Sequence, residues 1–195
     1  MNVKRKLKIV FLSSLILATF LIDCNKEYKG DDPEYFKKVE ETKSYLKAHV
    51  KEEYEIPETS LTKEVAVLRY LEAVQNGQID KYIFTKDEYI DIFIANSTGE
   101  NILANNMTLD QLRSFTDLRR MIAIEKLQNI FNKYKGRKFK IETLTWRPEV
   151  RKLNVLIGHR IGTLTISFGK EKVDLEEIKL VIEHKGKFKV CVIGT

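Results

Sequence analysis

The stretch 178-IKLVIEHKGKFKVCVI-193 decides the fold that we expect for this chain. Apolar residues recur at every second position on both sides of Lys185-Gly186, and this period indicates two β-strands. Two residues ending in glycine between such runs predict a tight hairpin turn in which Gly186 takes a positive φ. We expect one core face in this hairpin, built from Ile178, Leu180, Ile182, Phe188, Val190 and Val192. Lys187 and Lys189 are then expected to face water or the mouth of a pocket.

The alternating pattern extends upstream to residue 138. We expect strands over 138–147, 153–157, 161–168, 173–175, 178–183 and 188–193. The first of these strands changes parity between Ile141 and Leu144. Because side chains alternate strictly along a strand, this change requires a bulge near Thr143 or burial of both faces.

Residues 33–135 carry helical signals instead. Asp32-Pro33, Ser60 and the capping boxes at 85–88 and 108–111 each predict a helix start. We expect helices over 34–53, over 61–75, from residue 86, and from 109 to 134. The core face expected for the second helix consists of Leu61, Val65, Leu68, Leu71 and Val74. The apolar run 121–124 exceeds one helix face, so the middle of the last helix is expected to be buried on two sides.

Helices followed by antiparallel strands predict an α+β fold with the helices on one face of the sheet. We expect a single domain over 33–195, with helices to about 135 and a curved, cone-like, mainly antiparallel sheet over 138–193. The expected core consists of Leu68, Leu71, Ile122, Leu127, Ile130, Leu164, Ile166, Leu180, Ile182, Phe188 and Val190.

The start of the chain predicts export. Four cations between Lys4 and Lys8 precede an apolar stretch over 9–22, which is too short to cross a bilayer as a helix. Residues 1–23 therefore read as an export signal. Leu21-Ile22-Asp23-Cys24 resembles the lipobox of bacterial lipoproteins, and the resemblance implies that Cys24 is the first mature residue and carries palmitate-like acyl chains. Residues 24–32 are then a tether. An uncleaved signal anchor is the alternative.

This reading places the protein in the bacterial cell envelope. Asn25, which follows the lipidated residue, favours the outer membrane or the cell surface. The formal net charge is +6, and the signal's four cations and Asp23 account for +3 of it. The remaining cations alternate with acidic residues, so we expect no nucleic-acid partner. Cys191 is expected to be a packed thiol.

Two stretches resemble the nuclear transport factor 2-like (cystatin-like α+β) superfamily. Its members often end in a strand, a glycine turn and a closing strand, as residues 179–190 do here, and Leu71–Asp80 looks like its early helix. The resemblance implies a cone in which a curved sheet wraps around helices. The apolar pocket of such a cone binds a small molecule or is filled by side chains.

Related enzymes of that superfamily place an Asp, Tyr or His in the cone for proton transfer. The corresponding candidates here are Asp87, Tyr89 and Asp91 with Trp146 as a wall, although the spacing also fits the wet face of an amphipathic helix. Three further candidates are the histidines. His49 and His184 are expected at the surface. His159, within 158-GHRIG-162, is expected in a turn between two strands or in contact with a ligand.

We therefore expect a membrane-anchored lipoprotein with no catalytic, metal or cofactor residues, whose domain binds a protein partner or a small apolar ligand. Its membrane partner is reached through the lipid at Cys24. The alternative is a periplasmic or surface enzyme of the isomerase or dehydratase type. That alternative requires an inward-facing Asp or Glu with an aromatic or His partner within hydrogen-bond reach.

Overall fold

The computed structural model describes residues 32–97 and 105–194. The export signal, Cys24 and residues 25–31 of the expected tether lie outside this range. Contacts divide the chain into two compact units, Met1–Phe36 and Lys37–Thr195. The second unit contains every element described below except the first turn of α2.

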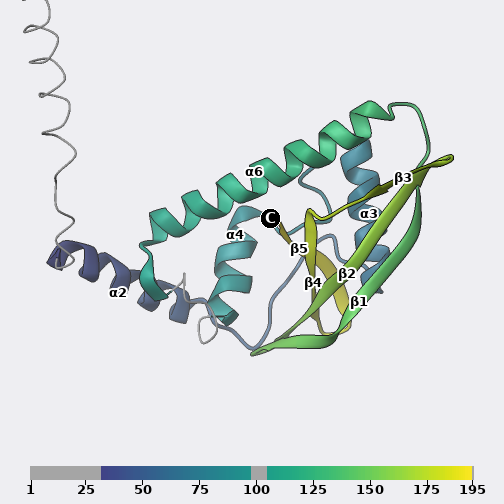
Figure 1. The fold of residues 1–195 in the computed structure, drawn as a ribbon. Coiled ribbons are helices and arrows are strands. Elements are labelled where there is room, and N and C mark those ends of the chain that lie inside the picture. Colours follow the sequence, from purple (N-terminus) through teal and green to yellow (C-terminus); the bar gives the residue numbers. More distant parts are fainter. Residues whose placement is uncertain (1–31, 98–104, 195) are drawn as a thin grey trace, which may run out of the picture. The chain divides into compact units, whose positions relative to one another are not determined.

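The second unit is an α+β fold in which helices precede an antiparallel sheet (Figure 1). The helical elements are α2 (Pro33–Ala48), α3 (Lys63–Gln75), α4 (Lys86–Glu88), the π-helical η1 (Tyr89–Ile94), the 3-10 turn η2 (Ala95–Ser97) and α6 (Leu109–Lys133). The strands are β1 (Lys140–Leu153), β2 (Leu156–Phe168), β3 (Glu171–Asp174), β4 (Ile178–His184) and β5 (Lys187–Ile193). The expected fold class is confirmed.

The sheet has the strand order β1-β2-β4-β5, and β3 also pairs with β2. One edge of β2 pairs with β1, and its other edge pairs with β4 through 157–160 and with β3 through 165–168. The register of β1 against β2 shifts between Ile141 and Thr143, so the expected bulge is confirmed. This bulge keeps Ile141 and Leu144 on the same packed face.

The expected break in the chain at 158–162 is wrong, because β2 runs unbroken through it and the reversal falls at Asn154-Val155. The two glycines leave room for the neighbouring strands. A Cβ on Gly158 would lie 3.2 Å from a methyl group of Leu180, and one on Gly162 only 2.8 Å from Thr145 Oγ1. Close strand approach, and no turn, explains both glycines.

The helix ends follow the expected capping chemistry with one exception. Both capping boxes form, at Thr85/Glu88 and at Thr108/Gln111. Helix α3 is capped by Thr62 and not by Ser60. Ser60 instead exchanges two backbone hydrogen bonds of 2.8 Å with Phe188, and so covers the outer edge of β5.

Helix α3 turns a different face to the core from the one expected. Leu61, Val65 and Leu68 are exposed, whereas the helix buries Ala66, Val67, Tyr70, Leu71, Ala73 and Val74. Apolar residues surround most of this helix, so periodicity alone does not select a face. The buried face combines two small alanines with Tyr70, which lets the helix approach the sheet closely.

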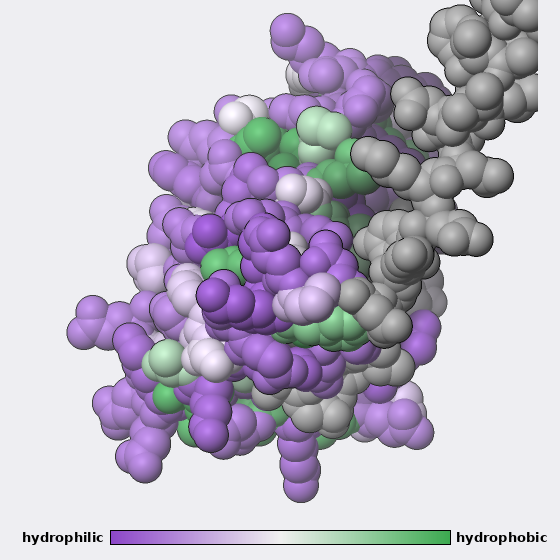
Figure 2. Space-filling model, turned by 90° about the vertical axis from the view of Figure 1, so that its left-hand side faces the viewer, coloured by the Kyte–Doolittle hydropathy of each residue, from purple (hydrophilic) through white to green (hydrophobic). Residues whose placement is uncertain are grey.

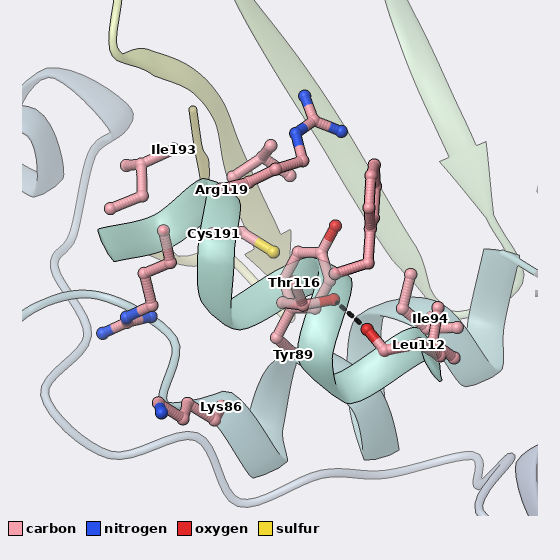
Figure 3. A pocket seen from close by; sticks show the side chains of 11 residues that line it. Lys86, Tyr89, Ile94, Leu112, Thr116, Arg119, Cys191 and Ile193 are labelled. Atoms are coloured by element: carbon pink, nitrogen blue, oxygen red, sulfur yellow. Dashed lines mark hydrogen bonds between the residues drawn. The ribbon is translucent and has the colours of Figure 1, made fainter. Parts of the chain in front are cut away.

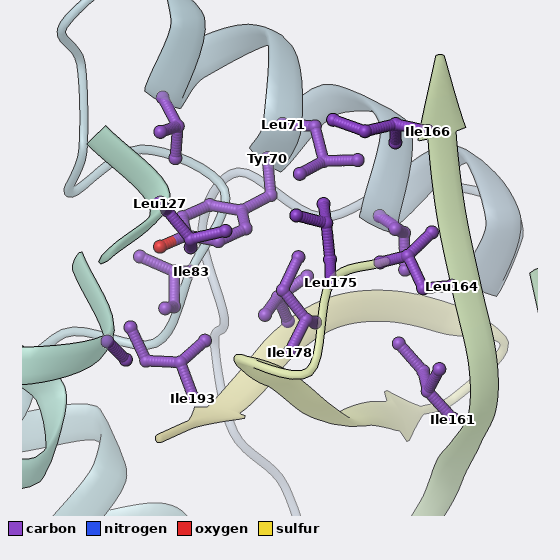
Figure 4. Packing of buried hydrophobic residues seen from close by; sticks show 14 of the residues in the cluster. Tyr70, Leu71, Ile83, Leu127, Ile161, Leu164, Ile166, Leu175, Ile178 and Ile193 are labelled. Carbon is purple, nitrogen blue, oxygen red and sulfur yellow. The ribbon is translucent and has the colours of Figure 1, made fainter. Parts of the chain in front are cut away.

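The core consists of two clusters, one on each face of β4 and β5. The first joins α3 and the second half of α6 to the sheet, and Figure 4 shows Tyr70, Leu127 and Ile178 pointing toward one another in it. The second contains η1 and the tip of the β1–β2 hairpin. We expected helices on one face of the sheet only. For these two strands the prediction is wrong, because helical elements pack against both faces.

This double cover also corrects the closing hairpin. The turn is as expected, with φ of 52° at Lys185 and 72° at Gly186. However, Val181 lies opposite Val190 in the first cluster, while Leu180 belongs to the second. The expected single core face is therefore wrong, because both faces of this hairpin are buried.

Helix α6 crosses the end of β5, and a Cβ on Gly194 would touch Arg119 (Figure 1). The middle of α6 was expected to be buried on two sides, but Met121 is 60% and Ile122 40% exposed. One side of this helix therefore remains an apolar surface. On the face drawn in Figure 2, hydrophilic side chains predominate and apolar ones gather in small patches.

Candidate functional site

Four side chains meet on the face of the sheet that carries the first cluster, near the closing turn. We call Trp146, His159, Glu183 and Phe188 the sheet-face site. His159 Nε2 lies 2.7 Å from Glu183 Oε2, and the two side chains are 13% and 24% exposed. The register places Glu183 opposite Phe188. Antiparallel pairing thus brings together residues of β1, β2, β4 and β5.

The two aromatic rings flank the histidine. The ring of Trp146 meets His159 edge-on at 6.3 Å between centroids, and the ring of Phe188 lies 5.7 Å away. The indole Nε1–H of Trp146 donates to Glu64 Oε1 over 2.9 Å, and Lys63 Nζ lies 4.7 Å from the indole centroid. The first turn of α3 therefore holds the indole in place.

Apolar side chains surround the sheet-face site and remain in contact with solvent. Val150 lies opposite His159 in the β1–β2 ladder, and Ile157 lies opposite Glu183 in the β2–β4 ladder. Val150 is 44% exposed and Ile157 36%. Aromatic residues are enriched at protein-binding surfaces, so two half-buried rings beside exposed apolar side chains fit such a surface.

A separate pocket lies between η1, the first half of α6 and the end of β5 (Figure 3). Tyr89, Leu112, Phe115 and Cys191 are among its lining residues. Its free volume of about 40 Å³ accommodates little more than a water molecule, far below the about 300 Å³ at which small-molecule sites begin. This pocket is too small for an apolar ligand of that kind.

Cys191 is buried, as expected, and burial raises the pKa of its thiol well above the usual value. Burial also raises the pKa of Tyr89 in the same pocket. Both groups are therefore neutral at physiological pH, and neither is an activated nucleophile.

The other two histidines have structural partners. His184 was expected at the surface but is buried, and its Nε2 accepts from the backbone N–H of Tyr54 over 3.3 Å. Its Nδ1 lies 3.3 Å from the carbonyl oxygen of Val155. His49 is half-buried, and its ring lies 4.1 Å from that of Tyr45. The β1–β2 reversal folds over His184, which is why the hairpin turn position did not predict its burial.

The structure does not bring the expected catalytic candidates together. Asp87 is exposed in α4, Tyr89 lines the small pocket, and Asp91 accepts a hydrogen bond of 2.8 Å from Tyr45 Oη. Trp146 packs against the first cluster, whereas Tyr89 packs against the second. Trp146 and Tyr89 therefore do not line a common pocket.

A buried ion pair was missed by sequence reasoning. Lys189, expected to face water, is 2% exposed and lies 2.9 Å from Glu88 of the first capping box. Nearby, Arg120 binds Asp80 over 3.0 Å and donates to the carbonyl oxygen of Phe84. These contacts fasten residues 80–88 to β5 and α6. The pairing of two distant residues left no local signal in the sequence.

Glu183 was also missed, because its partner His159 lies 24 residues away. Within 32–97 and 105–194, no group of three metal-ligating side chains is close enough to hold a metal ion. No helix in that same part of the chain is both long and apolar enough to span a bilayer. Comparison with protein-family models, with curated proteins and with solved structures found no match.

Proposed function

We propose that this protein is a lipid-anchored protein of the bacterial cell envelope whose folded unit binds a protein partner through the sheet-face site. The anchoring rests on the sequence alone, namely the cationic start, the short apolar stretch and Leu21 before Cys24. The resemblance to the nuclear transport factor 2-like superfamily carries no part of the proposal. The closing hairpin was expected to place Phe188 and Leu180 on one core face, but they lie on opposite faces.

One observation carries the binding role: Trp146 is held half-buried among exposed apolar side chains. Tryptophan is among the residues enriched at the energetic centres of protein interfaces. The exposed apolar residues beside the site are Val150 and Ile157. Of the two ligand classes considered, we favour a protein partner over a small apolar molecule here, because small-molecule sites enclose most of the ligand's surface whereas the sheet-face site is open to solvent.

Acyl labelling tests the anchor. The wild-type protein is expected to incorporate labelled palmitate and to sediment with membranes, while Cys24→Ala stays an unlabelled precursor. Cys191→Ala is the matched control, because the other cysteine is buried and is expected to leave labelling unchanged. Failure to label the wild type, or equal labelling of Cys24→Ala, would contradict lipidation.

Site-specific photocrosslinking tests the binding role. A benzophenone side chain at Ile157 is expected to give a discrete crosslinked product in cells, and the same group at the exposed Asn132 of α6 is not. Trp146→Ala should abolish the Ile157 product, whereas Leu68→Ala, an exposed position on α3, should preserve it. A product that survives Trp146→Ala places the partner elsewhere.

The enzyme alternative is favoured by one specific contact. Glu183, whose side chain is 24% exposed, lies 2.7 Å from His159 Nε2, within the hydrogen-bond reach that proton transfer requires. Incorporation of solvent deuterium beside the carbonyl of simple ketones, followed by NMR, tests this role. Exchange by the wild type that is lost in Glu183→Gln supports an isomerase; the absence of wild-type exchange argues against it.

A further inference from the structure

An apolar ridge runs along the outer side of α6. Its members are Phe115, Leu118, Met121 and Ile122, which are 37%, 52%, 60% and 40% exposed. Their spacing of three or four residues places them on one side of the helix. Ala123 and Leu127, on the opposite side, are at most 1% exposed. The core therefore uses one side of α6, and the ridge is a second apolar side that the described residues leave in solvent.

Cations border the ridge. The guanidinium carbon of Arg119 lies 5.5 Å from the ring centroid of Phe115, and Lys126 is exposed one turn beyond Ile122. The acidic residues beside the ridge are Asp117, which is paired with Lys86 over 2.9 Å, and the exposed Glu125, one turn beyond Met121. An apolar side bordered by basic residues is typical of helices that lie in the interface of a bilayer.

An open groove extends the ridge on the Asp117 side. Its volume is about 700 Å³, and its apolar lining residues are Ile79, Leu118, Met121 and Ile124. An acyl chain or the apolar part of a headgroup region has room there, in contrast to the small pocket at Cys191. The groove shares Leu118 and Met121 with the ridge, and the rest of its lining includes the charged residues Asp80, Lys86, Asp117, Arg120 and Glu125.

The chain enters the compact unit at the end of α6 that precedes the ridge. Lys38 and Tyr45 of α2 line a groove together with Thr108 and Asp110 at the start of α6. Pro33 follows Cys24 by nine residue steps, so the tether reaches at most about 30 Å. A unit of this size is about 40 Å across. A lipid on Cys24 would thus keep this end of the unit, and the ridge beside it, near the membrane.

We propose that the α6 ridge contacts the phospholipid bilayer and fixes the orientation of the folded unit on the membrane. This inference rests on the proposed lipid anchor. The lipid anchor then retains the protein at the membrane, and the ridge orients the folded unit on it.

Fluorescence of the full-length, membrane-purified protein in phosphatidylcholine–phosphatidylglycerol vesicles tests the ridge. Met121→Cys is labelled with the environment-sensitive dye NBD, and Leu61→Cys, 82% exposed and outside α6, is the matched control. The buried Cys191 does not compete for the dye. NBD at position 121 is expected to brighten several-fold, and lipids carrying spin labels near the headgroup should quench it. NBD at position 61 should respond to neither. Adding Leu118→Glu and Ile122→Glu to Met121→Cys should remove the response.

The outcomes separate the ridge from the anchor. Equal, weak emission at positions 121 and 61, while the protein still sediments with the vesicles, overturns the ridge contact and leaves the anchor intact. Loss of sedimentation overturns the anchor and the inference together. Bright emission at position 121 without quenching by spin-labelled lipid shows that a protein, such as a second copy, covers the ridge.

Discussion

At the scale of single residues, burial in this protein depends on partners that lie far away in the chain. Lys189 stands in a regular alternating strand and lies opposite Ile182, so its side chain enters the second cluster. Glu88, 101 residues earlier, neutralises it there. The ammonium group also lies 5.8 Å from the ring centroid of Phe84. An alternating pattern shows that two faces exist, but it does not show that both are covered.

Removal of Lys189 is expected to destabilise the fold strongly. Lys189→Ala leaves the carboxylate of Glu88, 13% exposed, without its cation, and breaking a buried pair in this way costs about 3–5 kcal/mol. The free energy of unfolding from urea titration is the measurement. Lys179→Ala, at an exposed position of β4, is the control and should stay within about 0.5 kcal/mol of the wild type. A small effect of Lys189→Ala would mean that the ion pair does not form.

At the scale of elements, the residues at which helices and turns begin were easier to predict than the face that a helix buries. Both capping boxes and the Lys185-Gly186 turn depend on a few adjacent residues, and all three form as expected. The face of α3 depends on what packs against it. Apolar residues lie on two sides of that helix, so packing against the sheet determines which side is buried.

The face of α3 makes a matched pair of variants informative. Leu71 is fully buried and Leu68 is 37% exposed on the same helix. Leu71→Ala is expected to cost about 2–5 kcal/mol because it leaves a cavity, whereas Leu68→Ala should cost well under 1 kcal/mol. Thermal and urea unfolding of both variants are the measurements. A larger loss at Leu68 than at Leu71 would restore the helix face that periodicity alone predicts.

At the scale of the whole molecule, the order of helices and strands was enough to predict the α+β class. The two-sided core and the sheet-face site were beyond prediction, because both follow from strand order. Only the pairing of β2 with β4 places His159 beside Glu183. The sequence around residues 159 and 183 does not indicate that either side chain has a partner on another strand. The proposed lipid anchor, by contrast, rests on a local motif before Cys24 and stays a prediction from the sequence alone.

The buried thiol and tyrosine hydroxyl groups predict a loss of stability at alkaline pH. Burial raises the pKa values of Cys191, Tyr70 and Tyr89 in the folded state. The unfolded chain therefore releases these protons first and binds fewer protons than the native state, so stability falls as pH rises. The fall should begin near the ordinary thiol pKa of about 8.5.

Unfolding free energies at pH 7, 9 and 10 measure this slope. Cys191→Ala should flatten its first part, between pH 8 and 10, and leave the later part that the tyrosines contribute. In the wild type, the rate at which Cys191 reacts with a thiol reagent should follow the rate of unfolding. Rapid labelling under native conditions, or stability that rises across this pH range, would show that the Cys191 thiol is accessible to solvent in the folded state.

The position of β5 in both core clusters has a consequence for export. Val190 completes one cluster and Cys191 the other, and residues 187–193 follow every segment with which they pair. A chain that emerges from the ribosome amino end first therefore lacks the strand that closes either core until residue 193 has been made. If the chain is exported as we propose, it reaches the secretion machinery before this strand has closed either core. We then expect the final folding step to take place on the far side of the membrane.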